Sequence, residues 1–287
     1  MAQQYDAPFV PAPEPAPRPR KWPLAGVMEI DFVIALVAFV GLTLLVQIAF
    51  VGIRVAQQGL SLADLQARLR DQAEAVKLIG ADGLFATLLA TNAAFALIPI
   101  ARVRWLRHEP LAEIGFQARN LPKLIAIGVG VGVLSLLANG LISGLFQRYG
   151  VVPDQSAQFP LFQGDYLGQA LFMLGAAVLA PIGEEILFRG YVFNALRETF
   201  GQRRWGLPLA YGVSALLFAA VHVFSVSRGL LGLMLPLFVI GLLLAWAMHT
   251  TRSLLPCIIA HAINNGVALV ALVICINNPG MAGCPAI

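Results

Sequence analysis

The sequence predicts an all-α fold, a polytopic transmembrane helical bundle with about seven spans. Hydrophobic residues make up 59% of the 287 residues and charged residues only 12%, whereas a soluble globular chain carries about 25% charged residues. So few charges cannot cover a water-exposed surface, and the mean hydropathy of +0.79 agrees with this. The composition therefore excludes a soluble enzyme and a chain that is disordered throughout.

Seven apolar runs are long enough for membrane helices, each of which needs about 20 mostly apolar residues. The expected spans are residues 32–53, 83–103, 124–146, 167–196, 205–224, 229–248 and 254–276. They divide the chain into a disordered Pro-rich tail (1–26), N-terminal membrane helices (27–166), a membrane core (167–276) and a short C-terminal tail (277–287).

Basic residues are distributed unevenly between the two sides of these spans. The side that holds the N-terminus carries 12 Lys and Arg residues and the opposite side carries 6. Because Lys and Arg collect in cytoplasmic loops, we expect a cytosolic N-terminus in a bacterial cell (inner) membrane. The modest net charge of +4 reflects this topology and indicates no nucleic-acid partner.

Two further patterns predict local structure. Apolar residues recur at helical spacing near 61–79, with Ser61 as a suitable N-cap, which predicts an interfacial helix or, alternatively, a lid. Gly128 and Gly132, and again Gly140 and Gly144, have the spacing of close helix packing.

The three cysteines lie in the last 31 residues and lack zinc-site spacing. We expect Cys257, Cys275 and Cys284 to be apolar helix residues or unpaired thiols. A bridge between Cys275 and Cys284 is the alternative if the C-terminus lies in an oxidising compartment.

Ionisable residues inside membrane spans indicate function, since burying a charge in lipid is costly. Glu184 and Glu185 are adjacent in the fourth span, after Pro181, which should kink the helix. Glu185 and Arg189 are four residues apart and can pair on one helix face, and no other cation is expected in their layer. Glu184 points about 100° away and needs a partner from another helix.

His222 in the fifth span and His261 and Asn265 in the seventh are the other polar candidates. His261 and Asn265 share one helix face, which suits a metal, a water molecule or a developing oxyanion. Counted from the cytosolic ends at about 1.5 Å per residue, these groups and Glu184 reach a common layer.

The three motifs together resemble the CPBP (Abi) family of intramembrane proteases, which includes the type II CAAX prenyl endopeptidases. The motifs are Glu-Glu-x-x-x-Arg (Glu184, Glu185, Arg189), Phe-x-x-x-His (Phe218, His222) and His-x-x-x-Asn (His261, Asn265). They occur in this order on three expected membrane helices. The resemblance covers the core of residues 167–276, which it identifies as catalytic.

The resemblance implies hydrolysis of peptide bonds in membrane-associated or lipid-modified peptides. Glu184 and His222 would activate water, His261 and Asn265 would stabilise the oxyanion, and Glu185 and Arg189 would support the catalytic helix. Another interpretation makes Glu184, His222, His261 and Asn265 ligands of a divalent metal such as zinc. Two His and one Glu form a familiar catalytic zinc set, but Asn is an uncommon ligand, so we favour metal-independent glutamate chemistry.

Other classes of protein could use the same buried polar groups. A membrane transporter also lines a cavity with Glu, His and Asn, and a bacteriocin-immunity or scaffold protein would need no catalysis. The hydropathy pattern contains no inverted repeat, which weighs against a transporter.

Overall fold

The computed structural model describes residues 25–153, 155, 161–281 and 284, and these residues form helices and no β-strand. The N-terminal part consists of α1 (Ala25–Gln58), α2 (Leu62–Arg70), α3 (Gln72–Ala101), the π-helix η1 (Arg102–Leu106), the 3₁₀ turn η2 (Leu111–Ile114) and α4 (Leu121–Arg148). The rest consists of α5 (Tyr166–Leu174), η4 (Gly175–Leu179), α6 (Ala180–Glu185), η5 (Ile186–Phe193), α7 (Asn194–Phe200), α8 (Gly206–Ala220), η6 (Val223–Ser225), α9 (Leu230–Thr251) and α10 (Leu254–Asn277).

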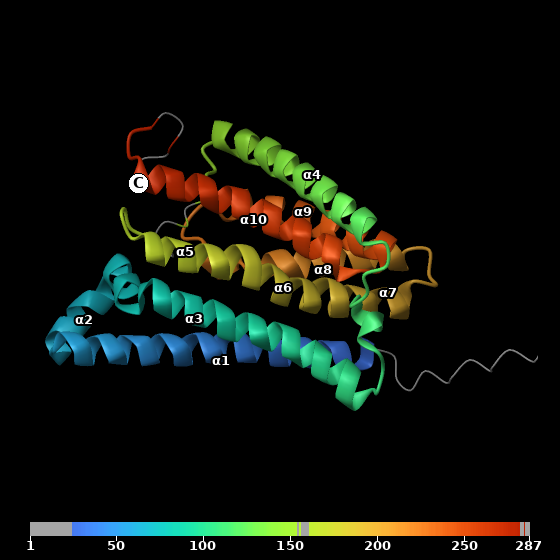
Figure 1. Ribbon diagram of the computed structural model, residues 1–287, viewed down its shortest axis with the longest axis horizontal. Helices are drawn as coiled ribbons and strands as arrows, with labels where there is room; N and C mark the ends of the chain where they lie inside the picture. Colours follow the sequence, from blue (N-terminus) through green and yellow to red (C-terminus); the bar gives the residue numbers. More distant parts are fainter. Residues whose placement is uncertain (1–24, 154, 156–160, 282–283, 285–287) are drawn as a thin grey trace, which may run out of the picture.

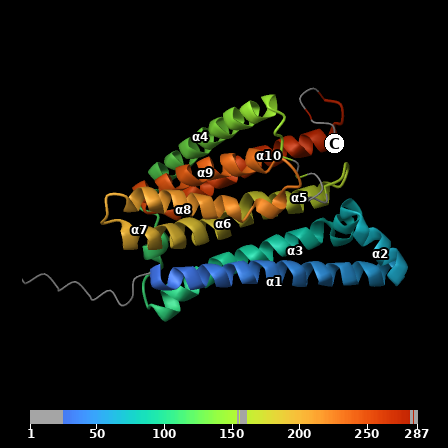
Figure 2. The ribbon, with the colours of Figure 1, turned by 180° about the vertical axis from the view of Figure 1, so that it is seen from behind.

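The long helices lie side by side in one bundle (Figure 1). Helices α1 and α3 pair on one side, and α4 packs against α9 and α10 on the other (Figures 1 and 2). The continuous run from α5 to α7, called here the central helix, lies between them and contacts α3, α8, α9 and α10. This arrangement confirms the predicted helical bundle.

Six described helical stretches are long and apolar enough to cross a membrane, so the chain is a multi-pass membrane protein. They are Gly26–Gln58, Glu74–Leu106, Leu121–Arg148, Tyr166–Phe200, Leu230–Thr251 and Leu254–Asn277. The stretch expected as a span at residues 205–224 forms a shorter apolar helix. Helix α8 has only 15 residues, about 22 Å at 1.5 Å per residue, against a hydrocarbon core of about 30 Å.

Helix α1 begins seven residues before the expected span because the charge of Asp31 is neutralised inside the bundle. The Asp31 carboxylate accepts hydrogen bonds from Arg102 Nε at 2.7 Å and Nη2 at 2.6 Å. The Tyr191 hydroxyl of η5 donates to the same carboxylate, and Asp31 is only 2% exposed. This contact ties α1 and η1 to the central helix. Of the tail expected over residues 1–26, Ala25 and Gly26 begin α1, and residues 1–24 lie outside the described residues.

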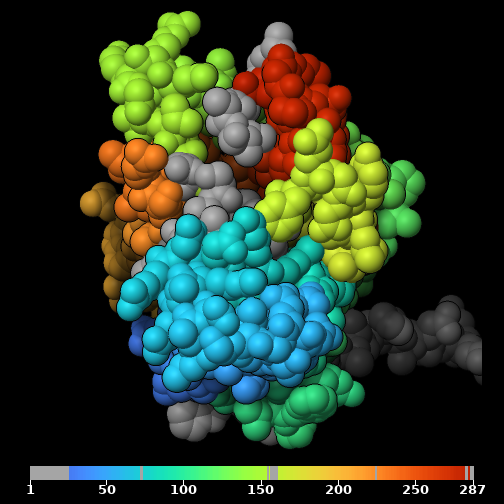
Figure 3. Space-filling model, turned by 90° about the vertical axis from the view of Figure 1, so that its left-hand side faces the viewer, coloured from blue at the N-terminus to red at the C-terminus, as the bar shows by residue number. Residues whose placement is uncertain are grey.

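The expected single helix over 61–79 is two helical segments. Ser61 caps α2 as predicted: Asp64 N–H donates to Ser61 Oγ at 3.2 Å, and Ser61 N–H donates to the Asp64 carboxylate at 3.1 Å. The Ser61 hydrogen bonds lower the pKa of the exposed Asp64. Asp71 then leaves the helical conformation (φ −102°, ψ 119°). A further break within α3 falls at Gly80, where φ is 73°, so α2 lies across one end of the bundle (Figure 3).

Only the first glycine pair of α4 makes the close packing that its spacing predicts. A Cβ atom on Gly128 would lie 2.9 Å from Ile259 Cβ, and one on Gly132 would lie 3.1 Å from Ile263 Cβ, both on α10. A Cβ at Gly140 or Gly144 would meet no described atom within 4 Å. The prediction is therefore wrong for the second pair, because α4 diverges from α10 toward its end (Figure 1).

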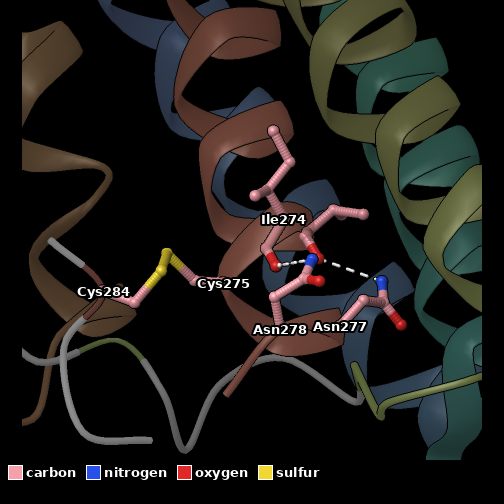
Figure 4. Close-up of a disulfide and its surroundings, with 6 residues drawn as sticks. Ile274, Cys275, Asn277, Asn278 and Cys284 are labelled. Atoms are coloured by element: carbon pink, nitrogen blue, oxygen red, sulfur yellow. Dashed lines mark hydrogen bonds between the residues drawn. A yellow bond between two sulfur atoms is a disulfide. The ribbon is translucent and has the colours of Figure 1, made fainter. Parts of the chain in front are cut away.

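Cys275 and Cys284 form a disulfide, which corrects the expectation that both are unpaired (Figure 4). Their Cα atoms are 5.4 Å apart, within the usual range for a bridge. Gly280, at φ 96°, lets the chain reverse after α10 and return to the helix end. The Pro279–Gly280 pair was the sequence signal for this turn. Cys257 is buried and free, as expected.

Candidate active site

The central helix departs from α-helical geometry on both sides of the segment that carries Glu184. The π-helices η4 and η5 flank α6, and π segments within α-helices are frequent at functional sites. Pro181 lies at the start of α6 and has no backbone N–H to donate. The irregularity expected near Pro181 is therefore a π-helical segment, η4, directly before α6.

Glu185 is the centre of a buried ionic network. Its Oε1 accepts a hydrogen bond from Arg189 Nη1 at 2.8 Å and lies 2.8 Å from His261 Nδ1. The side chains of Glu185 and Arg189 are fully buried. The predicted pair forms. His261 of α10 lies against the same Glu185 oxygen, a contact that spacing along the central helix could not predict.

The aromatic ring of Phe218 in α8 packs against this network. The Arg189 guanidinium lies 4.2 Å from its ring centroid, a cation–π distance. The rings of His261 and His222 contact it edge-on at 5.5 and 5.4 Å. This explains the first residue of the Phe-x-x-x-His motif, to which the sequence assigned no role.

Glu184 points away from Glu185, as the helical period predicts, and reaches His261 from the other side. Its Oε2 lies 3.9 Å from His261 Nε2, and its side chain is 12% exposed. Oε2 is buried and has no hydrogen-bond partner among the described residues. If Nδ1 of His261 donates to Glu185, a neutral ring presents an unprotonated Nε2 toward Glu184.

Within the described part of the chain, no hydrogen bond or ion pair joins His222 to Glu184 or His261. Its Nδ1 donates to the Phe218 carbonyl at 3.0 Å, since a carbonyl oxygen only accepts. Both histidine rings contact the same Phe218 ring. The structure thus brings together Glu184, Glu185 and His261, and Phe218 links His222 to this group.

Asn265 is engaged by the backbone of the central helix. Its Nδ2 donates to the Ala176 carbonyl at 3.0 Å. Ala176 is five residues before Pro181, so it is the carbonyl that the missing N–H of Pro181 would bond in a π-helical pattern. The Asn265 amide thus satisfies an acceptor that proline leaves open, and it docks α10 onto η4.

Two further asparagines near this layer were missed by sequence reasoning. Asn92 of α3 and Asn264 of α10 are 7% and 6% exposed, and each has a buried Oδ1 without a partner among the described residues. A Cβ at Gly183 would lie 2.5 Å from the Asn92 carbonyl oxygen. Glycine before Glu184 therefore lets α6 approach α3 closely, and polar residues within apolar spans were the available signal.

The four candidate metal ligands do not form a metal site in this arrangement. The described residues contain no group of three His, Cys, Asp or Glu side chains placed to hold a metal ion. The amide nitrogen of Asn265 donates to a backbone carbonyl, and His222 Nδ1 is bonded to the Phe218 carbonyl. The residues present do not fit a zinc set, so no step below is derived through a metal.

Fold and site define the class as a polytopic membrane protein with a buried glutamate–histidine centre. Residues 166–267 match the family model described as type II CAAX prenyl endopeptidase Rce1-like. This part of the chain is similar to that Rce1-like family, and the residues of the centre on the central helix, α8 and α10 lie within the matched segment.

Two relatives share part of the chain. An uncharacterized 24.3 kDa protein of Escherichia coli is 29% identical over 159 residues, which are 55% of this chain and 66% of the relative. The UPF0177 protein YxdF of Lactococcus lactis is 23% identical over 139 residues, 47% of this chain and 69% of the relative. No solved structure matches the chain at a comparable level.

The buried pair can be tested by a double-mutant cycle on thermal unfolding. Glu185→Gln and Arg189→Met should each cost about 3–5 kcal/mol, because each leaves one charge alone in the apolar interior. The double variant should lose less than the sum of the two. The exposed Glu74–Lys77 pair, with side chains 38% and 49% exposed, is the control and should show almost no coupling. Additive losses at Glu185 and Arg189 would contradict a functional pairing.

The docking role of Asn265 can be tested against Pro181. Asn265→Leu should lower the free energy of unfolding by about 1–3 kcal/mol, because the buried Ala176 carbonyl loses its donor. In a Pro181→Ala background the loss should shrink, since the restored N–H can bond that carbonyl. Asn278→Leu, which removes an exposed bond at the end of α10, is the control. Equal losses in both backgrounds would argue against the role.

Proposed function

We propose that this protein is an intramembrane endopeptidase that hydrolyses peptide bonds of membrane-associated or lipid-modified peptides. One observation carries the proposal: within the Rce1-like segment, Glu185 fixes His261 so that its other ring nitrogen faces Glu184. A carboxylate and an imidazole oriented by a second buried acid form a general acid–base pair.

In the proposed reaction Glu184 is the general base. Its partly exposed carboxylate takes a proton from water while the water oxygen attacks the peptide carbonyl carbon. The proton then passes to the leaving amine as the carbon–nitrogen bond breaks, which returns Glu184 to the carboxylate form.

His261 is proposed to stabilise the oxyanion of the tetrahedral intermediate. Because Nδ1 is bonded to Glu185, Nε2 can donate only when the ring is an imidazolium. Glu184 and Glu185 each lie near one nitrogen of the ring. Glu185 is thus a positioning residue, held in turn by Arg189. The second N–H of Asn265 and the ring of His222 complete the proposed set of site residues.

The proposed setting is a bacterial inner membrane with the N-terminus in the cytosol. The distribution of Lys and Arg supports this orientation, and the Cys275–Cys284 disulfide suits a C-terminus on the oxidising side. The bilayer is then the immediate partner, and the substrate is a peptide that the lipid brings to the bundle.

Glu184→Gln should reduce turnover by about 10²–10⁴-fold, the range for loss of a general base. The measurement compares peptides released from membranes of cells that carry the wild-type chain or the variant. The melting temperature and membrane insertion should change little, because Glu184 has no hydrogen-bond partner to lose among the described residues.

Glu29→Gln is the matched control, since Glu29 is exposed at the start of α1. Its peptide pattern should equal that of the wild type. Near-wild-type cleavage by Glu184→Gln would remove the assignment and favour a transporter or scaffold.

Activity should survive chelation, because the described residues offer no three-ligand metal set. Protein purified in a strong chelator should retain its turnover and hold well below the roughly one zinc per chain of a catalytic zinc enzyme. Loss of turnover that zinc restores, together with about one bound zinc per chain, would reinstate the metal interpretation.

A further inference from the structure

A second polar cavity of about 590 Å³ lies apart from the candidate active site. It is formed by the connection from η1 to η2, by α7, by the turn into α8 and by the end of α9, at the end of the bundle where α7 is labelled in Figure 1. Asn194 on its wall follows Glu184 by ten residues, about 15 Å along a helix. The proposed peptidase reaction makes no use of this cavity.

Three arginines from three different segments line the cavity: Arg107, Arg197 and Arg252. Arg107 and Arg197 each have a buried Nη1 with no hydrogen-bond partner among the described residues, and so does Nδ1 of His249. The Arg107 side chain is only 9% exposed. Unsatisfied buried polar atoms are rare and destabilise the folded state, and charged ones destabilise it more.

The acidic residues of the cavity do not supply the missing partners. Glu109 bonds the other terminal nitrogen of Arg107, at 2.9 Å. Glu113, which is exposed, and Glu198 attract the Arg197 guanidinium by charge, but its Nη1 donates a hydrogen bond to neither of them in the described chain. The lining thus balances three arginines against three glutamates, so the cavity is a local hydrogen-bonding site and not a broad basic surface.

We propose that this cavity binds a phosphate group. A phosphate offers several acceptor oxygens at tetrahedral angles, which suit donors on different segments around one cavity, here Arg107, Arg197 and His249. Guanidinium groups bind phosphate by charge-assisted, directional hydrogen bonds. Asn194 Oδ1, also without a partner in the described chain, can accept from a hydroxyl on the phosphate or its ester.

The phosphate can belong to a lipid head group or to a soluble compound. Trp105, Leu106 and Trp205 are exposed at the same end of the bundle, and Trp is enriched where membrane helices meet the head groups. The cavity therefore lies at a depth that a phospholipid head group reaches.

The test uses the full chain in phosphate-free detergent and follows its melting temperature at constant ionic strength. One series adds inorganic phosphate and another adds a short-chain phosphatidylglycerol, with chloride as the blank. A rise with either ligand is expected, since a ligand that binds only the folded state stabilises it. A rise with phosphate indicates a site open to soluble phosphate, whereas a rise with the lipid alone identifies a head-group site.

Arg197→Gln should weaken this binding about tenfold or more, as expected from the loss of about one charge-assisted hydrogen bond. Each variant is compared with its own melting temperature without ligand, because the substitution also removes the contact of the guanidinium with the Phe193 ring. Arg104→Gln is the control, since Arg104 is exposed at the same end and does not line the cavity. Arg107→Gln is a second variant with the same expected loss.

The proposal is overturned if neither ligand shifts the melting temperature, or if Arg197→Gln and Arg107→Gln shift as the wild type does. Glu184→Gln should bind phosphate like the wild type. The outcome is therefore independent of whether the peptidase assignment holds.

Discussion

One fully buried carboxylate, Glu185, constrains the arrangement of the bundle. It accepts Arg189 from its own helix and lies against His261 from α10, and a charge left alone at that depth would cost several kcal/mol. The central helix and α10 must therefore keep one relative register. Phe218 adds α8 to the same constraint, because its ring covers the guanidinium and contacts both histidines.

The unusual geometry of the central helix follows from what surrounds it. All eight residues of η5 are buried, so this segment has no lipid-facing side. Its polar side chains, Arg189 and Tyr191, contact Glu185 and Asp31 inside the bundle. The wider π turns on either side of α6 change the angular positions of the residues that follow. Glu184 can then face the partly exposed side, Glu185 can face α10 and Gly183 can face α3.

Polar contacts follow one another along the central helix. Glu185 and Arg189 belong to the candidate active site, Tyr191 reaches Asp31 of α1, and Asn194 and Arg197 line the second cavity. Each contact joins the central helix to a different part of the bundle. The two sites are thus carried by one rigid element, with the Asp31–Tyr191 contact between them.

The sequence by itself determined the membrane class, most of the spans, the pairing of Glu185 with Arg189 and the family resemblance. Those conclusions rest on composition and on spacings of a few residues along one helix, which local geometry fixes. Only the tertiary structure decided that His261 contacts Glu185 Oε1 and that Asp31 lies inside the bundle. It also decided that Asn265 donates to the carbonyl left without the N–H of Pro181. These contacts join residues 71 to 160 positions apart, and no local pattern specifies which faces of distant helices meet.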